Sequence, residues 1–91
     1  MTDLTSDKIR KEIKLLIGNL TEREEHEIGD GADFTEELGL DSLMAMELMI
    51  AVDKKFKVDI PEEEFNKART VNDAVAMVEH WLGAGQITAN A

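Results

Sequence analysis

The chain has 91 residues, no cysteine, and 20 acidic side chains against 10 basic ones, which gives a formal net charge of −10. A chain of this length forms one domain, and without cysteine it has neither disulfides nor thiolate metal sites. The negative charge excludes nucleic acid and anionic membrane as partners, because both repel an acidic surface, and favours partners with basic patches. Hydrophobic residues make up 43% of the chain, which is enough for a folded core.

The N-terminal segment carries no targeting signal. Met1-Thr2-Asp3-Leu4 has no basic patch and no long apolar run, so it is neither a signal peptide nor a membrane span. Together with the absence of cysteine, this predicts a cytoplasmic protein.

The first predicted helix covers residues 6–18. Thr5 or Ser6 can cap its start, and Gly18 with Asn19 can end it. Its apolar residues recur at the spacing of one helical face, which predicts that this face packs on a core. These residues are Ile9, Ile13, Leu16, Ile17 and Leu20.

Residues 19–41 are acidic, contain three glycines and show no clear period. A structureless segment of this length is unusual in a small domain unless it is anchored or functional. Ile28, Phe34, Leu38 and Leu40 are spaced so that they can dip into a core. We therefore expect a long, ordered crossover connection.

The strongest predicted helix covers residues 42–56 and is apolar almost all round. Its polar residues form only a narrow stripe of Glu47, Asp53, Lys54 and Lys55. A helix of this kind is either buried on most sides or presents an apolar face to a partner. The methionines Met44, Met46 and Met49 favour flexible core filling, and they also suit a surface that adapts to several partners.

The rest of the chain predicts one short and one long helix. Ile60-Pro61 breaks the preceding helix, and the short helix runs to about residue 67. The last helix begins at Thr70, with Asp73 as a capping partner, and is expected to end at Gly83 and Gly85. The fold class is thus all-α: a four-helix bundle with three long helices, one short helix and a long crossover between the first two. The predicted domain spans residues 1–83, followed by a flexible tail at 84–91.

Asp41 and Ser42 open the apolar helix. The Asp41 carboxylate can cap it by accepting from the backbone N–H of Leu43 or Met44. Ser42 then occupies the first helical position, with a hydroxyl that points to solvent. Serine near a helix start is common, so the dipeptide alone indicates only a cap.

The sequence offers no catalytic or metal-binding constellation. His26 and His80 have no serine or cysteine at a meaningful spacing, so a hydrolase with Ser42 as nucleophile lacks a base. Asp30-Gly31-Ala32-Asp33 does not fit the register of a calcium loop, and no metal ligand set is predicted. An alternative function is an acidic helical adaptor or cation-responsive module without a covalent cofactor, docking through residues 42–56.

The context of Ser42 resembles the acyl carrier protein family. The resemblance covers residues 4–83 and is strongest over the motif Leu38-Gly39-Leu40-Asp41-Ser42-Leu43, with Ile60-Pro61-Glu62-Glu63 and Thr70-Val71-Asn72-Asp73-Ala74 downstream. In that family, 4′-phosphopantetheine from coenzyme A is attached to the serine at this position by a separate phosphopantetheinyl transferase. The thiol of the arm then holds acyl groups as thioesters.

The resemblance implies a carrier and not an enzyme. Asp41 would help to present Ser42 to the transferase. Partner enzymes, acyl-transferring and ketosynthase-type with basic docking patches, would meet the helix that follows the serine, and the chain is expected to be a monomer. The residues implied in docking are Leu43, Met44, Met46, Glu47 and Ile50.

Two departures bear on the pathway. Many fatty-acid carriers continue this helix with acidic residues, whereas this chain has Asp53-Lys54-Lys55, which shortens the acidic face. Leu40 before Asp41-Ser42, with Met44 after, is similar to carriers of polyketide or specialised acyl pathways. The sequence leaves fatty-acid, polyketide and related pathways open.

Overall fold

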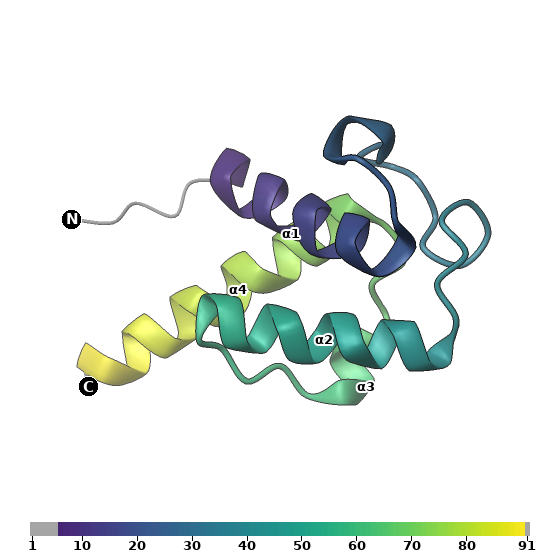
Figure 1. Ribbon diagram of the computed structural model, residues 1–91. Coiled ribbons are helices and arrows are strands. Elements are labelled where there is room, and N and C mark those ends of the chain that lie inside the picture. Colours follow the sequence, from purple (N-terminus) through teal and green to yellow (C-terminus); the bar gives the residue numbers. More distant parts are fainter. Residues whose placement is uncertain (1–5, 91) are drawn as a thin grey trace.

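The fold is a bundle of helices in which three are long and one is short. The computed structural model describes residues 6–90, and the side chains of residues 6–82. Its helices are α1 (Ser6–Thr21), α2 (Ser42–Phe56), α3 (Glu62–Phe65) and α4 (Val71–Asn90), with a single 3-10 turn, η1 (Glu25–Glu27), after α1 (Figure 1). Residues 6–90 contain no β-strand. The predicted all-α class with one short helix is therefore confirmed.

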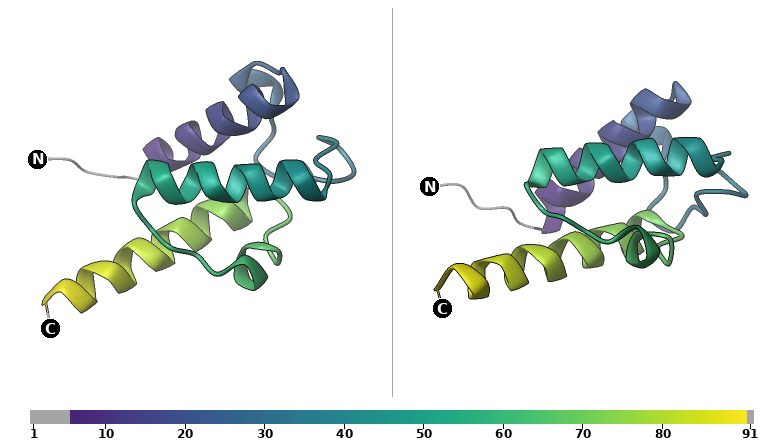
Figure 2. Two further views of the ribbon diagram at one scale, coloured as in Figure 1. Left: turned by 60° about the horizontal axis from the view of Figure 1, so that its bottom comes forward. Right: turned by 90° about the horizontal axis from the view of Figure 1, so that it is seen from below.

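The long connection between α1 and α2 gathers at one end of the bundle. Figure 1 and Figure 2 show that α2 and α4 both run away from this end, whereas α1 runs toward it. The helix α1 contacts both α2 and α4, and the short α3 packs against α2. The start of α2 consequently lies at the loop end, with α3 beside it.

The core is built from apolar side chains of every helix and of the connection. In α1, Ile9, Ile13 and Ile17 recur every fourth residue and are at most 1% exposed, so the predicted helical face is confirmed. Leu16 and Leu20 are only partly buried at its edge. None of the buried residues in the described part of the chain is polar or charged. The remaining buried core residues are Ile28, Phe34, Leu38, Leu40, Leu48, Val52, Phe56, Ile60, Phe65, Ala68, Val71, Ala74, Val75 and Val78.

The connection between α1 and α2 is ordered, as expected. All four predicted anchors in it are buried, each 6% exposed or less. Residues 34–38 form a compact turn, and the chain enters α2 through Gly39, whose φ of 71° lies in the left-handed region that glycine tolerates best.

The helix α1 is longer than predicted. It ends at Thr21 and not at Gly18, and the following residue, Glu22, takes a left-handed φ of 58°. Gly18 is instead a buried residue inside the helix, where the backbone of Arg23 folds back to donate a hydrogen bond to the Gly18 carbonyl at 3.0 Å. Gly18 is therefore not a stop signal, and the lack of a side chain there allows this close approach of Arg23.

The helix α4 also continues beyond its predicted end. It runs to Asn90 through both Gly83 and Gly85, so the expected stop at these glycines is wrong. A glycine weakens a helix by about 1 kcal/mol relative to alanine but keeps its backbone donor and acceptor, so the hydrogen-bond ladder can pass through it. A domain boundary at residue 83 and flexibility of the tail stay predictions, and residue 91 lies outside the described part.

No helix in the described part of the chain is both long and apolar enough to cross a membrane.

Candidate functional site: the serine at the start of α2

Asp41 caps α2. Its backbone is extended, with φ −89° and ψ −177°, and its Oδ1 accepts a hydrogen bond from the backbone N–H of Met44 at 2.9 Å. The Asp41 carbonyl accepts from the N–H of Ala45 at 2.8 Å, which closes the first helical turn. The carboxylate satisfies a helix-terminal donor that has no partner within the helix. The predicted cap is confirmed, with Met44 as the donor.

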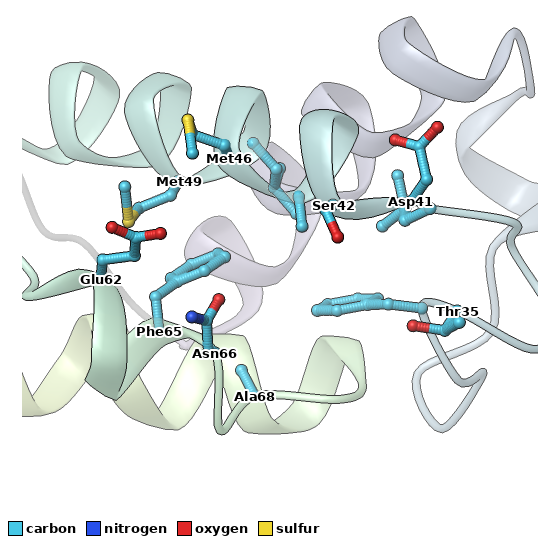
Figure 3. A pocket seen from close by; sticks show the side chains of 13 residues that line it. Thr35, Asp41, Ser42, Met46, Met49, Glu62, Phe65, Asn66 and Ala68 are labelled. Carbon is cyan, nitrogen blue, oxygen red and sulfur yellow. The ribbon is translucent and has the colours of Figure 1, made fainter.

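Ser42 is the first residue of α2, and its side chain is exposed. No hydrogen bond joins its hydroxyl to another side chain or to the backbone within the described residues. Figure 3 shows the hydroxyl pointing to the side of α2 that faces α3, while the Asp41 carboxylate points to a different side. The serine oxygen is therefore accessible from outside and is not engaged in a network.

A pocket of about 520 Å³ opens beside Ser42, between α2 and α3. Met46 and Met49 border it from α2, and Phe65 and Asn66 border it from the α3 side (Figure 3). The lining also includes the buried side chains of Phe34, Leu40, Leu48 and Ala68 and the exposed polar side chains of Thr35 and Glu62. The pocket thus has an apolar interior and a polar rim directly next to the serine.

The outer face of α2 exposes apolar side chains. Leu43 is 65% exposed, Met46 44% and Ile50 50%, and they recur at helical spacing on one face. Glu47 is also exposed. Five residues are expected to face partners, and four of them are exposed. The fifth, Met44, is only half-exposed and packs against the core.

The methionines divide between the two roles that the sequence left open. Met44 and Met49 are partly buried against the core, whereas Met46 is exposed. Met49 and the α3 residues at the pocket were not among the predicted site residues. Met49 could have been found, because it lies two turns after Ser42 on the same helix. A four-residue helix such as α3 carries no periodic signal.

Two aspartates fasten the connection that precedes Ser42. The Asp30 carboxylate lies 2.6 Å from Lys14 Nζ, and the hydrogen bond from this ammonium group lowers the pKa of Asp30. Backbone hydrogen bonds from Glu36 and Thr35 lower the pKa of Asp33, with a further contribution from the nearby Arg69 guanidinium. Both carboxylates consequently stay ionised at neutral pH.

The pKa of Asp53, farther along α2, is shifted in the opposite direction. Burial raises the pKa of its carboxyl group, although the group accepts a hydrogen bond from the N–H of Ile60 at 3.2 Å. It lies in the last turns of the helix, where the helix dipole also disfavours a negative charge. Asp53 serves to join α2 to the segment before α3, and it does not line the pocket.

No hydrogen bond joins the Ser42 hydroxyl to a base among the described residues. Neither histidine is among the pocket residues, and the Asp41 carboxylate is engaged in the helix cap. Within the described residues, no group of three or more histidine, cysteine or acidic side chains could hold a metal ion. The geometry suits a hydroxyl that another protein modifies.

The sequence matches a family model that agrees with this geometry. Residues 11–78 match the model described as a phosphopantetheine attachment site, which spans most of the chain. The chain belongs to this family of carrier domains, whose cofactor is covalently attached 4′-phosphopantetheine.

The fold is that of an acyl carrier protein. The chain is similar to the solved structure of the acyl carrier protein from Enterococcus faecalis, described for its high thermal stability, with a TM-score of 0.73 and 23% identity. The similarity covers 86% of this chain and 99% of that one. Together with the family model, this fold supports the role of an acyl carrier, a kind of protein that is generally not itself a catalyst.

The residues at the start of α2 fit the cofactor. A phosphodiester needs an accessible hydroxyl, which Ser42 provides, and an arm with amide groups and methyl groups needs neighbours of both kinds. The apolar interior and the polar rim of the pocket offer both. When attached, the arm supplies a thiol that holds an acyl group as a thioester.

Proposed function

We propose that Ser42 is the residue that carries the 4′-phosphopantetheine arm, and that the chain transports acyl intermediates of a fatty-acid, polyketide or related pathway. The observation that carries this proposal is the accessible Ser42 hydroxyl, unengaged by the described residues, at the N-terminus of α2. The matched family model and the fold supply the context in which such a hydroxyl is modified.

In the attachment step, the Ser42 oxygen forms a bond to the phosphorus that bears pantetheine in coenzyme A. The bond from that phosphorus to the bridging oxygen of the pyrophosphate breaks, and adenosine 3′,5′-bisphosphate leaves. The hydroxyl proton passes to a base of the transferase or to solvent, because no side chain among the described residues hydrogen-bonds to this hydroxyl. Asp41 contributes by fixing the first turn of α2, which holds Ser42 at the exposed tip.

The proposed docking surface is the outer face of α2, formed by Leu43, Met46, Glu47 and Ile50, with Met44 at its edge. Three exposed apolar side chains recur on this helix face, and exposed apolar surface rimmed by polar residues is typical of interaction sites. The expected partners are the phosphopantetheinyl transferase and acyl-transferring and ketosynthase-type enzymes, whose basic patches the net charge of −10 would attract. We propose that the chain carries acyl groups in the cytoplasm and acts as a monomer.

The deciding experiment measures the intact mass of the full chain after incubation with coenzyme A and a broad-specificity phosphopantetheinyl transferase. We expect the mass to rise by one arm and Ser42→Ala to abolish the increase. Thr35→Ala is the matched control, because it removes another exposed hydroxyl from the same pocket. The proposal is wrong if the wild-type chain stays unmodified with several such transferases, or if Ser42→Ala still gains the arm.

The pathway is tested separately. The mass of the group bound as a thioester on the chain, purified from cells that make it, distinguishes a simple fatty acyl group from an oxygen-rich polyketide intermediate. An aminoacyl group would contradict the pathway part of the proposal and leave the attachment residue unaffected.

A further inference from the structure

The carboxylate of Asp33 accepts several of the hydrogen bonds that hold the loop leading into Ser42. We propose that Asp33 is a positioning residue for the modification of Ser42: it fixes residues 33–41 in the conformation that presents the serine to the transferase. This inference rests on the proposed attachment at Ser42.

Asp33 builds the turn that follows it. Its Oδ1 accepts hydrogen bonds from the backbone N–H groups of Thr35 and Glu36, both at 2.9 Å. In return, the Asp33 N–H donates to Oε1 of Glu37 at 2.8 Å. This reciprocal pattern resembles a capping box, except that the return contact comes from the fourth residue after Asp33 and not from the third. It satisfies donors at the start of the turn. Asp33 therefore sets the local conformation of residues 34–38.

Asp33 also ties this turn to the linker before α4. Its Oδ2 lies 3.3 Å from both Nε and Nη2 of Arg69, a residue 36 positions away in the sequence. The Arg69 carbonyl accepts a hydrogen bond from the N–H of Phe34 at 2.7 Å. A side-chain contact and a backbone contact thus join the same two segments.

Residues 34–38 are also linked to the start of α2. The Phe34 carbonyl accepts from the N–H of Leu40 at 2.8 Å, which closes the loop immediately before Asp41. Phe34 and Leu40 are both buried, and both line the pocket that Ser42 borders. A displacement of the turn would therefore move Leu40, and with it the cap that holds Ser42.

The contacts of Asp33 are not equal in strength. The Arg69 side chain is 65% exposed and that of Asp33 23%, and exposed ion pairs contribute little in water. The two hydrogen bonds to backbone N–H groups are shorter, at 2.9 Å, and removal of the carboxylate removes both. We therefore expect the capping function of Asp33 to outweigh its pairing with Arg69.

The expected kinetic effect is a change in KM for the chain as a substrate of the transferase. If Asp33 is lost, only a fraction of the molecules holds the loop in the competent conformation, and the apparent affinity falls by that fraction. Molecules that do bind present the same serine, so kcat stays near its original value. A loss comparable to that of a helix cap limits the rise in KM to about tenfold, a limit that is reached when the competent conformation becomes the minor one.

The experiment measures initial rates of mass gain on the full-length chain with a broad-specificity transferase, coenzyme A and varied chain concentration. Asp33→Ala is expected to raise KM with kcat unchanged. Asp33→Asn, which keeps an oxygen acceptor for the turn, should restore most of the wild-type KM, and Arg69→Gln should raise it by less than twofold. Glu36→Ala is the matched control, because it removes a neighbouring exposed charge while the backbone N–H that Asp33 binds remains.

The outcomes separate this inference from the proposed function. A wild-type chain that gains no arm contradicts the attachment at Ser42. A modified wild type with an Asp33→Ala variant of equal KM, or with a loss confined to kcat, overturns the role of Asp33 alone. If Asp33→Ala does not fold by circular dichroism, the test uses Asp33→Ser, which keeps a shorter acceptor, together with exchange of the Leu40 amide hydrogen. Unchanged protection of that amide, with unchanged KM, contradicts the inference.

Discussion

Gly18 allows a backbone approach that no other residue would permit. A Cβ atom at this position would lie 2.5 Å from the carbonyl oxygen of Arg23, and backbone cannot swing aside as a flexible side chain can. We expect Gly18→Ala to lower the free energy of unfolding by about 1–2 kcal/mol, since the clash outweighs the better helix propensity of alanine. Urea denaturation measures the change. Gly31→Ala is the control, because a Cβ there meets nothing within 4 Å; equal stability of the two variants would contradict the argument.

Ionisation of Asp53 lowers the stability of the folded protein. Its pKa is raised in the folded protein, so folding favours the protonated form, and the ionised form destabilises the fold above the folded-state pKa. Asp53→Asn removes the charge and keeps an oxygen for the Ile60 N–H. We expect a higher melting temperature than wild type at pH 7, with the gain shrinking as the pH falls toward the unfolded-state value of 3.8. A gain that persists unchanged at pH 3 would show that the charge is not its cause.

Residue by residue, the sequence was most informative where one local interaction decides the structure. Asp41 and Ser42 were predictable because a helix cap involves residues only three apart. The bond between Asp33 and Arg69 was not, because it joins segments that only the folded chain brings together. The position of Asn66 at the pocket was equally unpredictable, since Asn66 follows a helix that is too short to show a hydrophobic period.

At the scale of the element, α2 has two faces with different roles: an inner face that packs in the core and an outer face that is exposed. Leu48 is fully buried on its inner face, and Ile50 is half exposed on its outer face. We expect Leu48→Ala to lower the free energy of unfolding by about 2–5 kcal/mol, and Ile50→Gln to change it by no more than about 0.5 kcal/mol. Thermal and urea unfolding of both variants measure the difference.

Ile50→Gln also tests docking on the outer face of α2. Ile50→Gln is expected to raise the KM of the carrier for the transferase or for an acyl-transferring enzyme, because an apolar contact is lost at the interface while the fold is kept. The control is Lys11→Gln on α1, a polar exchange at an exposed residue outside this face. If both exchanges leave every tested enzyme unaffected, the outer face of α2 is not the docking surface.

Element ends were harder to predict than the elements themselves. The existence of all four helices followed from apolar spacing and from Pro61, because burial of a continuous face requires that spacing. The ends of α1 and α4 did not follow, since glycine permits a stop, a close approach or an uninterrupted helix. At Gly18 the choice is made by the chain that follows: Glu22 takes a left-handed φ, and the Arg23 N–H bonds back to the Gly18 carbonyl five residues earlier. The glycine alone does not reveal this contact.

At the scale of the whole molecule, charge opposes compactness. The net charge of −10 is held within a radius of gyration of 12.8 Å, which is comparable to the distance of about 10 Å over which 0.1 M salt screens. Ion pairs such as Lys14 with Asp30 and Lys55 with Glu12 relieve this repulsion only locally. The free energy of unfolding should therefore depend on ionic strength. It should increase with salt, because acidic residues are in excess and their repulsion is screened.

We expect the melting temperature to rise when NaCl is increased from about 10 mM to about 500 mM, because screening weakens repulsion among the acids more than it weakens the few exposed ion pairs. A gain of 1 kcal/mol corresponds to about 4–8 °C in a domain of this size. KCl at equal ionic strength is the control and should act equally. A rise that needs calcium, far above what NaCl gives at matched ionic strength, would instead favour a cation-responsive module. That result would contradict screening as the origin, because nonspecific screening depends on ionic strength and not on the identity of the cation.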